Sequence, residues 1–285
     1  MRVAILNPAE GVYREAAIEF SQKLMAVLAG GGLEATAVPW TQPEAAIAAG
    51  DLILPLVAWG YHLDLPRWFS VVGALEASGK RVLNPPSVLR WNSDKAYLRR
   101  LEAAGAPTVP TVFVDRGDAE AVEKARVTLG GGTVVVKPRV SGGAFGTIKV
   151  APGGSLDGGP EGPAMIQPYL RTVEVEGEYS LLYFGGRFGH ALTKTAAAGD
   201  FRVQPQFGGV VQTVTPPAEA LRTAERVLAS VEEPLLYARV DILRDDAGAW
   251  RLMELEAIEP HLFLDQAPDG GRAFVDAVAA TFRNS

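Results

Sequence analysis

Short apolar runs alternate with helical patterns over the N-terminal part of the chain. Residues 3–6 and 52–56 are almost entirely apolar, and residues 13–28 carry apolar side chains at helical spacing until Gly30, Gly31 and Gly32 end the pattern. Further strands are expected at residues 33–38 and 81–83, and helices at residues 43–49 and 64–78. Because strands that alternate with helices favour a parallel sheet, we predict an α/β N-terminal lobe, Rossmann-like, over residues 1–84.

A different pattern follows the break at Asn84, Pro85 and Pro86. We expect a central lobe over residues 85–165 and a C-terminal lobe over residues 166–285, both α+β and the last largely antiparallel. The expected helices are residues 93–104, 119–129 and 218–230. The expected strands are residues 111–114, 133–137, 148–150, 165–169, 179–184, 188–195, 236–243 and 250–255. A loop at residues 140–147 holds three glycines, and residues 151–163 are a Gly- and Pro-rich connection.

Composition limits the kinds of molecule that the protein is expected to bind. The net charge is −6 at pH 7, which argues against a nucleic acid held on a basic surface. The absence of cysteine excludes disulfides and thiolate metal sites. The chain starts with a short apolar run rather than a leader, and no stretch has the roughly twenty apolar residues of a membrane helix, so we expect a cytoplasmic protein without a membrane partner.

Carboxylates on two neighbouring strands give the strongest chemical signal. Asp241 lies within one expected strand, and Glu254 and Glu256 lie two residues apart on the next. Side chains two residues apart in a strand share a face, where like charges repel unless a cation lies between them. Carboxylate oxygens without a nearby His or Cys favour Mg²⁺. A solvated polar strand face is the alternative, but the apolar neighbours indicate a half-buried strand.

Two lysines and a glycine-rich loop are weaker signals when taken singly. Lys95 is expected at the start of a helix, and Lys137 follows three apolar residues at the end of a strand. Either lysine alone is more often a solvated surface charge. The loop from Ser141 to Gly146 is either a hairpin turn or a site where backbone N–H groups approach phosphate oxygens, and it lacks the Gly-Lys-Ser/Thr of a Walker A loop.

Taken in order, these residues resemble the ATP-grasp superfamily, in the branch of D-alanine ligases, glutathione synthetases and ribosomal-protein glutamate ligases. The resemblance covers nearly the whole chain and implies ATP and Mg²⁺ as cofactors. It implies phosphate contacts for Lys95 and Lys137, and a lid that includes Ser141, Gly142 and Gly143. It also implies roles for residues farther along the chain: adenine contacts from Gln167, Tyr169 and Leu170, ribose binding by Glu178, and phosphate and metal binding by Arg239, Asp241 and Glu254. The third metal ligand is commonly Asn in this family, whereas this chain has Glu256.

Four segments resemble a bacterial subgroup of these enzymes, the ATP-grasp proteins of D-cycloserine biosynthesis, which close a ring on an O-ureido-serine. They are residues 58–62, 90–95, 199–204 and 253–260. We therefore expect an ATP-dependent ligase for an amino-acid-like small molecule, either carboxylate-amine or ring-closing, which acts through a phosphorylated acyl or carbonyl-oxygen intermediate. Arg202, Arg239 and Lys194 are the expected catalytic groups. A small-molecule kinase and a non-catalytic ATP-binding protein remain alternatives, and homo-oligomerisation is left open.

Overall fold

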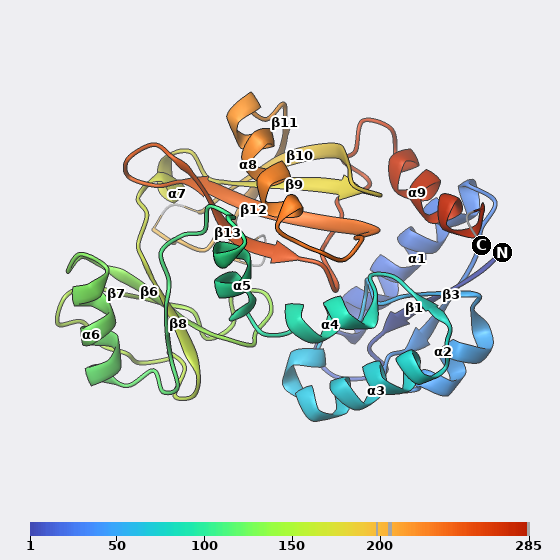
Figure 1. Cartoon of the computed structure of the whole chain (residues 1–285), viewed down its shortest axis with the longest axis horizontal. Helices are drawn as coiled ribbons and strands as arrows, with labels where there is room; N and C mark the ends of the chain where they lie inside the picture. The colour runs from blue at the N-terminus through green and yellow to red at the C-terminus, as the bar shows by residue number, and fades with distance from the viewer. Residues whose placement is uncertain (198, 205–206, 284–285) are drawn as a thin grey trace.

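Three sheets organise the computed structural model, which describes residues 1–197, 199–204 and 207–283 (Figure 1). The first sheet has the order β2-β1-β3-β4, and all its neighbours are parallel. Its strands are β1 (Arg2–Asn7), β2 (Glu34–Pro39), β3 (Leu52–Leu54) and β4 (Arg81–Val82). The accompanying helices are α1 (Arg14–Gly30), α2 (Pro43–Ala49), α3 (Leu65–Ala77) and the short 3-10 helix Tyr61–Leu63. The predicted parallel sheet is therefore present.

Both faces of this first sheet are buried, which explains its continuous apolar strands. Val3 and Ile5 pack into one core cluster, and Ala4 and Leu6 pack into another on the opposite face. A parallel sheet covered on both faces has this pattern, because successive side chains point to opposite sides.

The second sheet is antiparallel and has the order β5-β8-β6-β7. Its strands are β5 (Val112–Val114), β6 (Val134–Pro138), β7 (Ile148–Val150) and β8 (Ala164–Pro168). Helix α6 (Ala119–Thr128) covers one face, where its residues Val122 and Ala125 form a small core with apolar residues of β6 and β8. The alternate residues of these strands, which include Lys137 and Gln167, therefore face the other side.

The third sheet is antiparallel, with the order β11-β10-β9-β12-β13. Its strands are β9 (Glu178–Phe184), β10 (Arg187–Thr195), β11 (Val210–Val214), β12 (Tyr237–Arg244) and β13 (Trp250–Glu256). Helices α7 (Thr172–Val175), α8 (Ala218–Ala229) and α9 (Arg272–Arg283) lie around it. Strand β11 and helix α9 were not expected from the sequence. Phe274, Val275 and Val278 of α9 enter the same core cluster as β1, α1 and β9.

The segment after the first sheet corrects one expectation. Instead of a single helix over residues 93–104, the chain forms α4 (Pro86–Asn92) and α5 (Tyr97–Ala103), and Lys95 lies in the turn between them. Pro86 opens α4, because a proline at the first helical position loses no hydrogen bond. Asp94 stabilises the turn by accepting a hydrogen bond from the backbone N–H of Ala96 at 2.8 Å.

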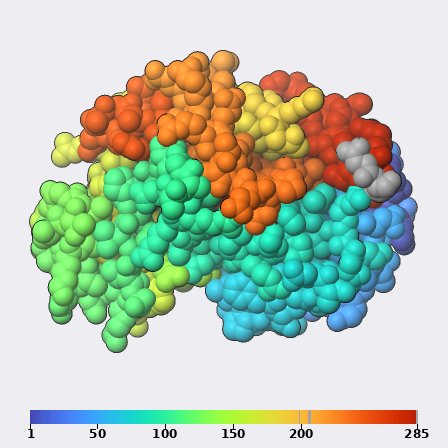
Figure 2. Space-filling view, in the orientation of Figure 1, coloured from blue at the N-terminus to red at the C-terminus, as the bar shows by residue number. Residues whose placement is uncertain are grey.

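The three parts form one body. In the space-filling view, the orange and red C-terminal segments pack directly on the cyan and green segments that precede them (Figure 2). Within the described residues, no helix is long and apolar enough to cross a membrane.

Candidate active site

A cavity of about 650 Å³ lies where the three sheets meet. Every site residue predicted from the sequence lines it, although these residues come from distant parts of the chain. They are Lys95, Lys137, Ser141, Gly142, Gly143, Gln167, Tyr169, Leu170, Glu178, Lys194, Arg202, Arg239, Asp241, Glu254 and Glu256. The sequence-based prediction therefore identified groups that share one location, whereas the role of each group stays a prediction.

The two lysines have different surroundings. Lys137 Nζ donates a hydrogen bond to Gln167 Oε1 at 2.8 Å and lies 3.1 Å from Met253 Sδ, and no ion-pair partner is found for it among the described residues. Burial lowers the pKa of Lys137 below its usual value. Lys95 Nζ donates to the carbonyl oxygen of Ser141 at 2.8 Å and forms an ion pair with Glu254 at 3.1 Å. Lys137 is thus a largely desolvated cation at the cavity wall, a position that favours an anionic ligand.

The glycine-rich loop lies close to the first sheet's connections. A Cβ atom on Gly142 would lie 3.1 Å from His62 Cε1, so a larger residue there would press on this ring. Gly143 and Gly146 have φ of 59° and 66°, a backbone conformation that favours glycine. His62 also lies 3.4 Å from the Tyr13 hydroxyl, and burial together with Lys95 lowers its pKa to about 4. The loop therefore closes over a neutral imidazole.

A buried network of charges lies on the third sheet. Lys194 and Glu178 are direct cross-strand partners and form an ion pair at 2.5 Å, and Lys194 lies 3.4 Å from Asp241. Asp241 also accepts hydrogen bonds from Ser180 Oγ at 2.5 Å and from Arg239 Nη2 at 2.9 Å. Burial alone would raise the pKa of Asp241, but Arg239 and Lys194 outweigh it and lower the pKa to about 2. Asp241 is therefore ionised at neutral pH.

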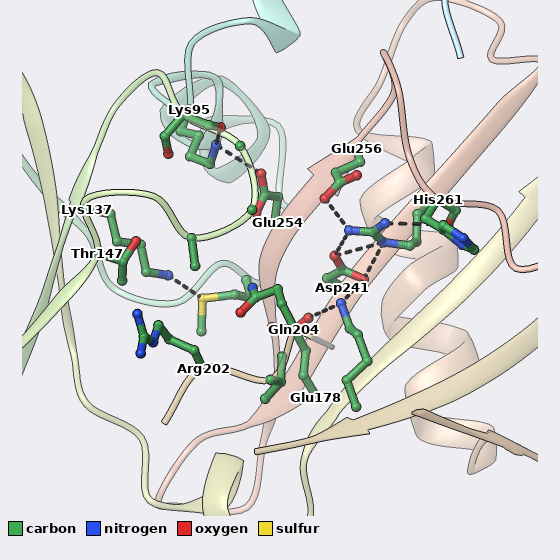
Figure 3. Close-up of a pocket in the computed structure, with 18 of the residues that line it drawn as sticks. Lys95, Lys137, Thr147, Glu178, Arg202, Gln204, Asp241, Glu254, Glu256 and His261 are labelled. Atoms are coloured by element: carbon green, nitrogen blue, oxygen red, sulfur yellow. Dashed lines mark hydrogen bonds and ion pairs between the residues drawn. The ribbon is translucent and has the colours of Figure 1, made fainter. Parts of the chain in front are cut away.

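The three predicted metal ligands already pair with basic side chains in this structure. Glu254 reaches toward Lys95, whereas Asp241 and Glu256 both pair with Arg239 (Figure 3). Across the part of the chain that the structure describes, no three carboxylate or imidazole groups are placed to hold a metal ion by themselves. Burial, together with Glu254 and Asp241, raises the pKa of Glu256 to about 7. This crowding of negative charge suits a cation such as Mg²⁺ that is completed by ligand oxygens.

Arg202 both lines the cavity and pairs with a neighbouring carboxylate. Its guanidinium pairs with Asp200 at 2.7 Å and lies 3.7 Å above the Phe207 ring, and it also lines the cavity. The hydrogen bonds from Arg202 lower the pKa of Asp200. The ion pair with Asp200 therefore holds the Arg202 guanidinium at the cavity instead of removing it from the site.

Several cavity residues were not assigned from the sequence. Asn92 lies on α4, where its side chain donates to the carbonyl oxygen of Leu255 and accepts from the N–H of Ala257, each at 2.8 Å. It thereby fixes the end of β13 beside Glu254 and Glu256. Thr147, Gln204, Tyr13, Trp59, Met253, Glu259, His261 and Phe263 also line the cavity. Trp59, Asn92, Gln204, Met253 and Glu259 lie within the four segments that resemble the subgroup, which was the available signal, whereas the others lie outside these segments.

Comparison with known proteins finds similarity to D-cycloserine synthetase. Residues 4–84 match the family model described as D-cycloserine synthetase DcsG, N-terminal domain. Cycloserine biosynthesis protein DcsG of Streptomyces lavendulae is 29% identical over 230 residues, which cover 70% of this chain and 73% of that protein.

Solved structures extend the likeness to the whole chain. The crystal structure of D-cycloserine synthetase DcsG superposes with a TM-score of 0.84 at 22% identity and covers 99% of both chains. D-alanine–D-alanine ligase from Bacillus anthracis, complexed with ATP, gives a TM-score of 0.73 at 18% identity and covers 99% of this chain and 97% of its own. These matches confirm the resemblance drawn from the sequence: the chain has the ATP-grasp fold over its whole length and is similar to D-cycloserine synthetase.

Proposed function

We propose that this protein is an ATP-dependent ligase that forms a C–N bond on an amino-acid-like substrate. The main supporting observation is Lys137, a half-buried ammonium that lines the cavity and has no carboxylate of the described residues within ion-pair distance. A carboxylate or carbonyl oxygen of the substrate attacks the γ-phosphorus and ADP leaves. An amine nitrogen then attacks the activated carbon, and its C–N bond forms as inorganic phosphate departs. The products are the ligated compound, ADP and phosphate.

In this proposal each of the three lobes supplies a different part of the site. An N-terminal lobe (residues 1–84) supplies one wall of the substrate site, a central lobe (residues 85–165) supplies the lysines and the lid, and a C-terminal lobe (residues 166–285) supplies the acidic network. Tyr169 and Leu170 lie beside the adenine, and Glu178 accepts from the ribose hydroxyls. Lys194 is released from Glu178 when that carboxylate turns to the ribose, and it then balances negative charge beside Asp241.

The cationic side chains act on the reacting phosphate. Lys95, Lys137, Arg202 and Arg239 offset the charge on its equatorial oxygens, where fixed donors stabilise the transition state more than the ground state. Asp241, Glu254 and Glu256 hold Mg²⁺, which supplies Lewis-acid stabilisation of phosphate oxygens when bound. The glycine-rich loop lies over the site and excludes the water that would hydrolyse an acyl phosphate.

The finer proposal is ring closure on O-ureido-D-serine to give D-cycloserine, on the basis of the similarity to DcsG over the whole chain. The carboxylate is then the phosphorylated group, and the ureido nitrogen that is bonded to oxygen is the nucleophile. Its bond to the acyl carbon forms as phosphate leaves, and one water then hydrolyses the carbamoyl group from this nitrogen to give CO2 and ammonia. The intramolecular attack needs no separate amine substrate, since both reacting groups enter the cavity together.

The test is phosphate release from ATP with O-ureido-D-serine, with the organic product followed by mass spectrometry. We expect one molecule of cyclised product per phosphate released, and no release when the substrate is omitted. Accumulation of a stable phosphorylated substrate would instead identify a kinase. No ATP turnover with any of a panel of amino acids would refute the ligase proposal.

A further inference from the structure

The cavity contains an acidic side chain that the proposed reaction does not use. Glu259 lies just after β13, between Ile258 and Pro260, which are both buried. Ile258 packs in the core cluster of the first sheet with Tyr61 and Trp68. The Tyr237 hydroxyl donates to the carbonyl oxygen of Ile258 at 2.8 Å. The backbone on the N-terminal side of Glu259 is thus held by two sheets, which fixes its carboxylate at the cavity wall.

The Glu259 carboxylate makes no hydrogen bond or ion pair with any other described residue, although it is half-buried. The remaining acidic groups of the cavity differ, because Glu178, Asp241, Glu254 and Glu256 each pair with a lysine or an arginine. An acidic group left unpaired at the wall of a cavity lacks its partner until a ligand supplies one.

Aromatic side chains surround this end of the cavity. Tyr13 and Tyr61 lie on either side of His62, with ring centroids 5.8 Å and 5.9 Å from the His62 ring. Glu259 lines the cavity together with Tyr13 and Tyr61, and after burial its negative charge is the next cause that raises the pKa of both tyrosines. A carboxylate beside aromatic rings is a favourable environment for an ammonium group, through a charged hydrogen bond and cation–π attraction.

Other roles for Glu259 fit the contacts less well. A fourth metal ligand would be expected to lie wholly among oxygen ligands. The charges of Glu254 and Glu256 do act on Glu259, but it also shares the cavity wall with the aromatic and apolar surface of Tyr13, Tyr61 and Ile258. Burial and the charges of Glu256 and Glu254 raise the pKa of Glu259 well above its usual range. A bound cation would offset both causes.

We propose that Glu259, with Tyr13 and Tyr61 beside it, binds the protonated amine of the substrate and so selects amino acids over the corresponding acids that lack an amine. The proposal rests on the proposed ligase function, because it assigns the amine-binding part of that same site. It places the amine beside Tyr13 and Tyr61, which belong to the first lobe.

The experiment compares O-ureido-D-serine with its analogue that lacks the α-amine, in the wild type and in Glu259→Gln. Phosphate release gives kcat/KM for each compound, and calorimetric titration in the presence of a non-hydrolysable ATP analogue gives each Kd without turnover. We expect wild type to prefer the amine-bearing compound by about 10- to 150-fold, the range that a charged hydrogen bond provides. Glu259→Gln should lose most of this preference, bind the analogue as wild type does, and keep the wild-type KM for ATP.

Asp265→Asn is the matched control, because Asp265 is an exposed carboxylate on the same segment and does not line the cavity. It should keep the full preference. If Glu259→Gln keeps the preference, or weakens the binding of both compounds equally, the amine-binding role is wrong. Turnover by wild type without any preference would refute the inference and leave the ligase function intact. Selective binding without turnover would refute the ligase function and leave the inference intact.

Discussion

Replacement of Lys137 by methionine tests the central feature of the site. Methionine has a similar length but no charge, so Lys137→Met removes the ammonium and keeps most of the packing. A charged hydrogen bond to a phosphate oxygen contributes about 1.5 to 3 kcal/mol, so the loss of one predicts a fall in kcat/KM for ATP of roughly 10- to 150-fold.

The same substitution should have the opposite effect on the protein without nucleotide. Wild type keeps a half-buried cation whose described partners are an amide oxygen and a thioether, which disfavours the folded state. We therefore expect the free energy of unfolding of Lys137→Met to equal or exceed that of wild type at pH 7. A variant whose activity falls while its stability holds has lost a functional group and not a structural one.

The pH dependence follows from the sign of the pKa shift. The pKa of Lys137 in the folded protein is lowered from the usual value of 10.5. At pH values between the lowered pKa and 10.5, the unfolded chain therefore binds more protons than the folded chain. The stability of wild type should therefore rise relative to Lys137→Met as the pH increases toward 10.5.

Denaturant unfolding across this pH range, beside steady-state phosphate release, measures both effects. Lys124→Met is the control, because Lys124 is an exposed lysine on α6 that pairs with Glu120. Its removal should change neither activity nor the pH trend. Undiminished kcat/KM in Lys137→Met, or a loss of stability larger than about 1 kcal/mol, would refute the reasoning, since an ordinary hydrogen bond contributes about that much.

Three further outcomes are expected. Glu254→Gln should abolish phosphate release while the melting temperature of the nucleotide-free protein changes little, and wild-type turnover would remove its metal-binding role. If Glu178 accepts from the ribose hydroxyls, the KM for 2′-deoxy-ATP should exceed that for ATP by roughly 5- to 150-fold, and equal KM values would contradict this role. Arg202→Lys and Arg202→Ala should lower kcat with little change in the KM for ATP, since a planar guanidinium engages two oxygens at once. Asp200→Asn breaks the ion pair but keeps the guanidinium, so it should lower kcat less than the Arg202 variants do. An equal fall in kcat would mean that Arg202 acts only through its ion pair with Asp200.

The sequence predicted the elements whose apolar pattern depends on local burial. The strands that hold Lys137, Asp241 and Glu254 were placed to within a residue or two, because runs of apolar and β-branched residues mark strands that are largely buried. The parallel first sheet followed from the same kind of pattern.

Features that depend on tertiary partners were missed. Helix α9 has a short apolar stripe whose meaning depends on α1 and β9, which lie far away in sequence. The pairs of Lys95 with Glu254 and of Arg239 with Glu256 join residues that the sequence had assigned to phosphate or to metal. Glu259 was noted only within a motif, because an unpaired carboxylate is recognised only once its neighbours are known.

The distribution of the cores has a consequence for how a nucleotide enters. The first and third sheets share a core cluster in which Ile5 and Leu28 pack with Leu182 and Phe184, whereas the helix-covered core of the central sheet shares no residue with it. We therefore expect the first and third sheets to behave as a fixed frame and the second sheet, in the central lobe, to rotate against it as a rigid body. The frame carries Glu254, and the moving part carries Lys137 and the loop at Ser141. Opening would then stretch the hydrogen bond between the backbone N–H of Lys95 and the carbonyl oxygen of Arg139, now 2.9 Å, and shift Met165 of β8 against Leu181 and Val240 of the third sheet, with which it packs.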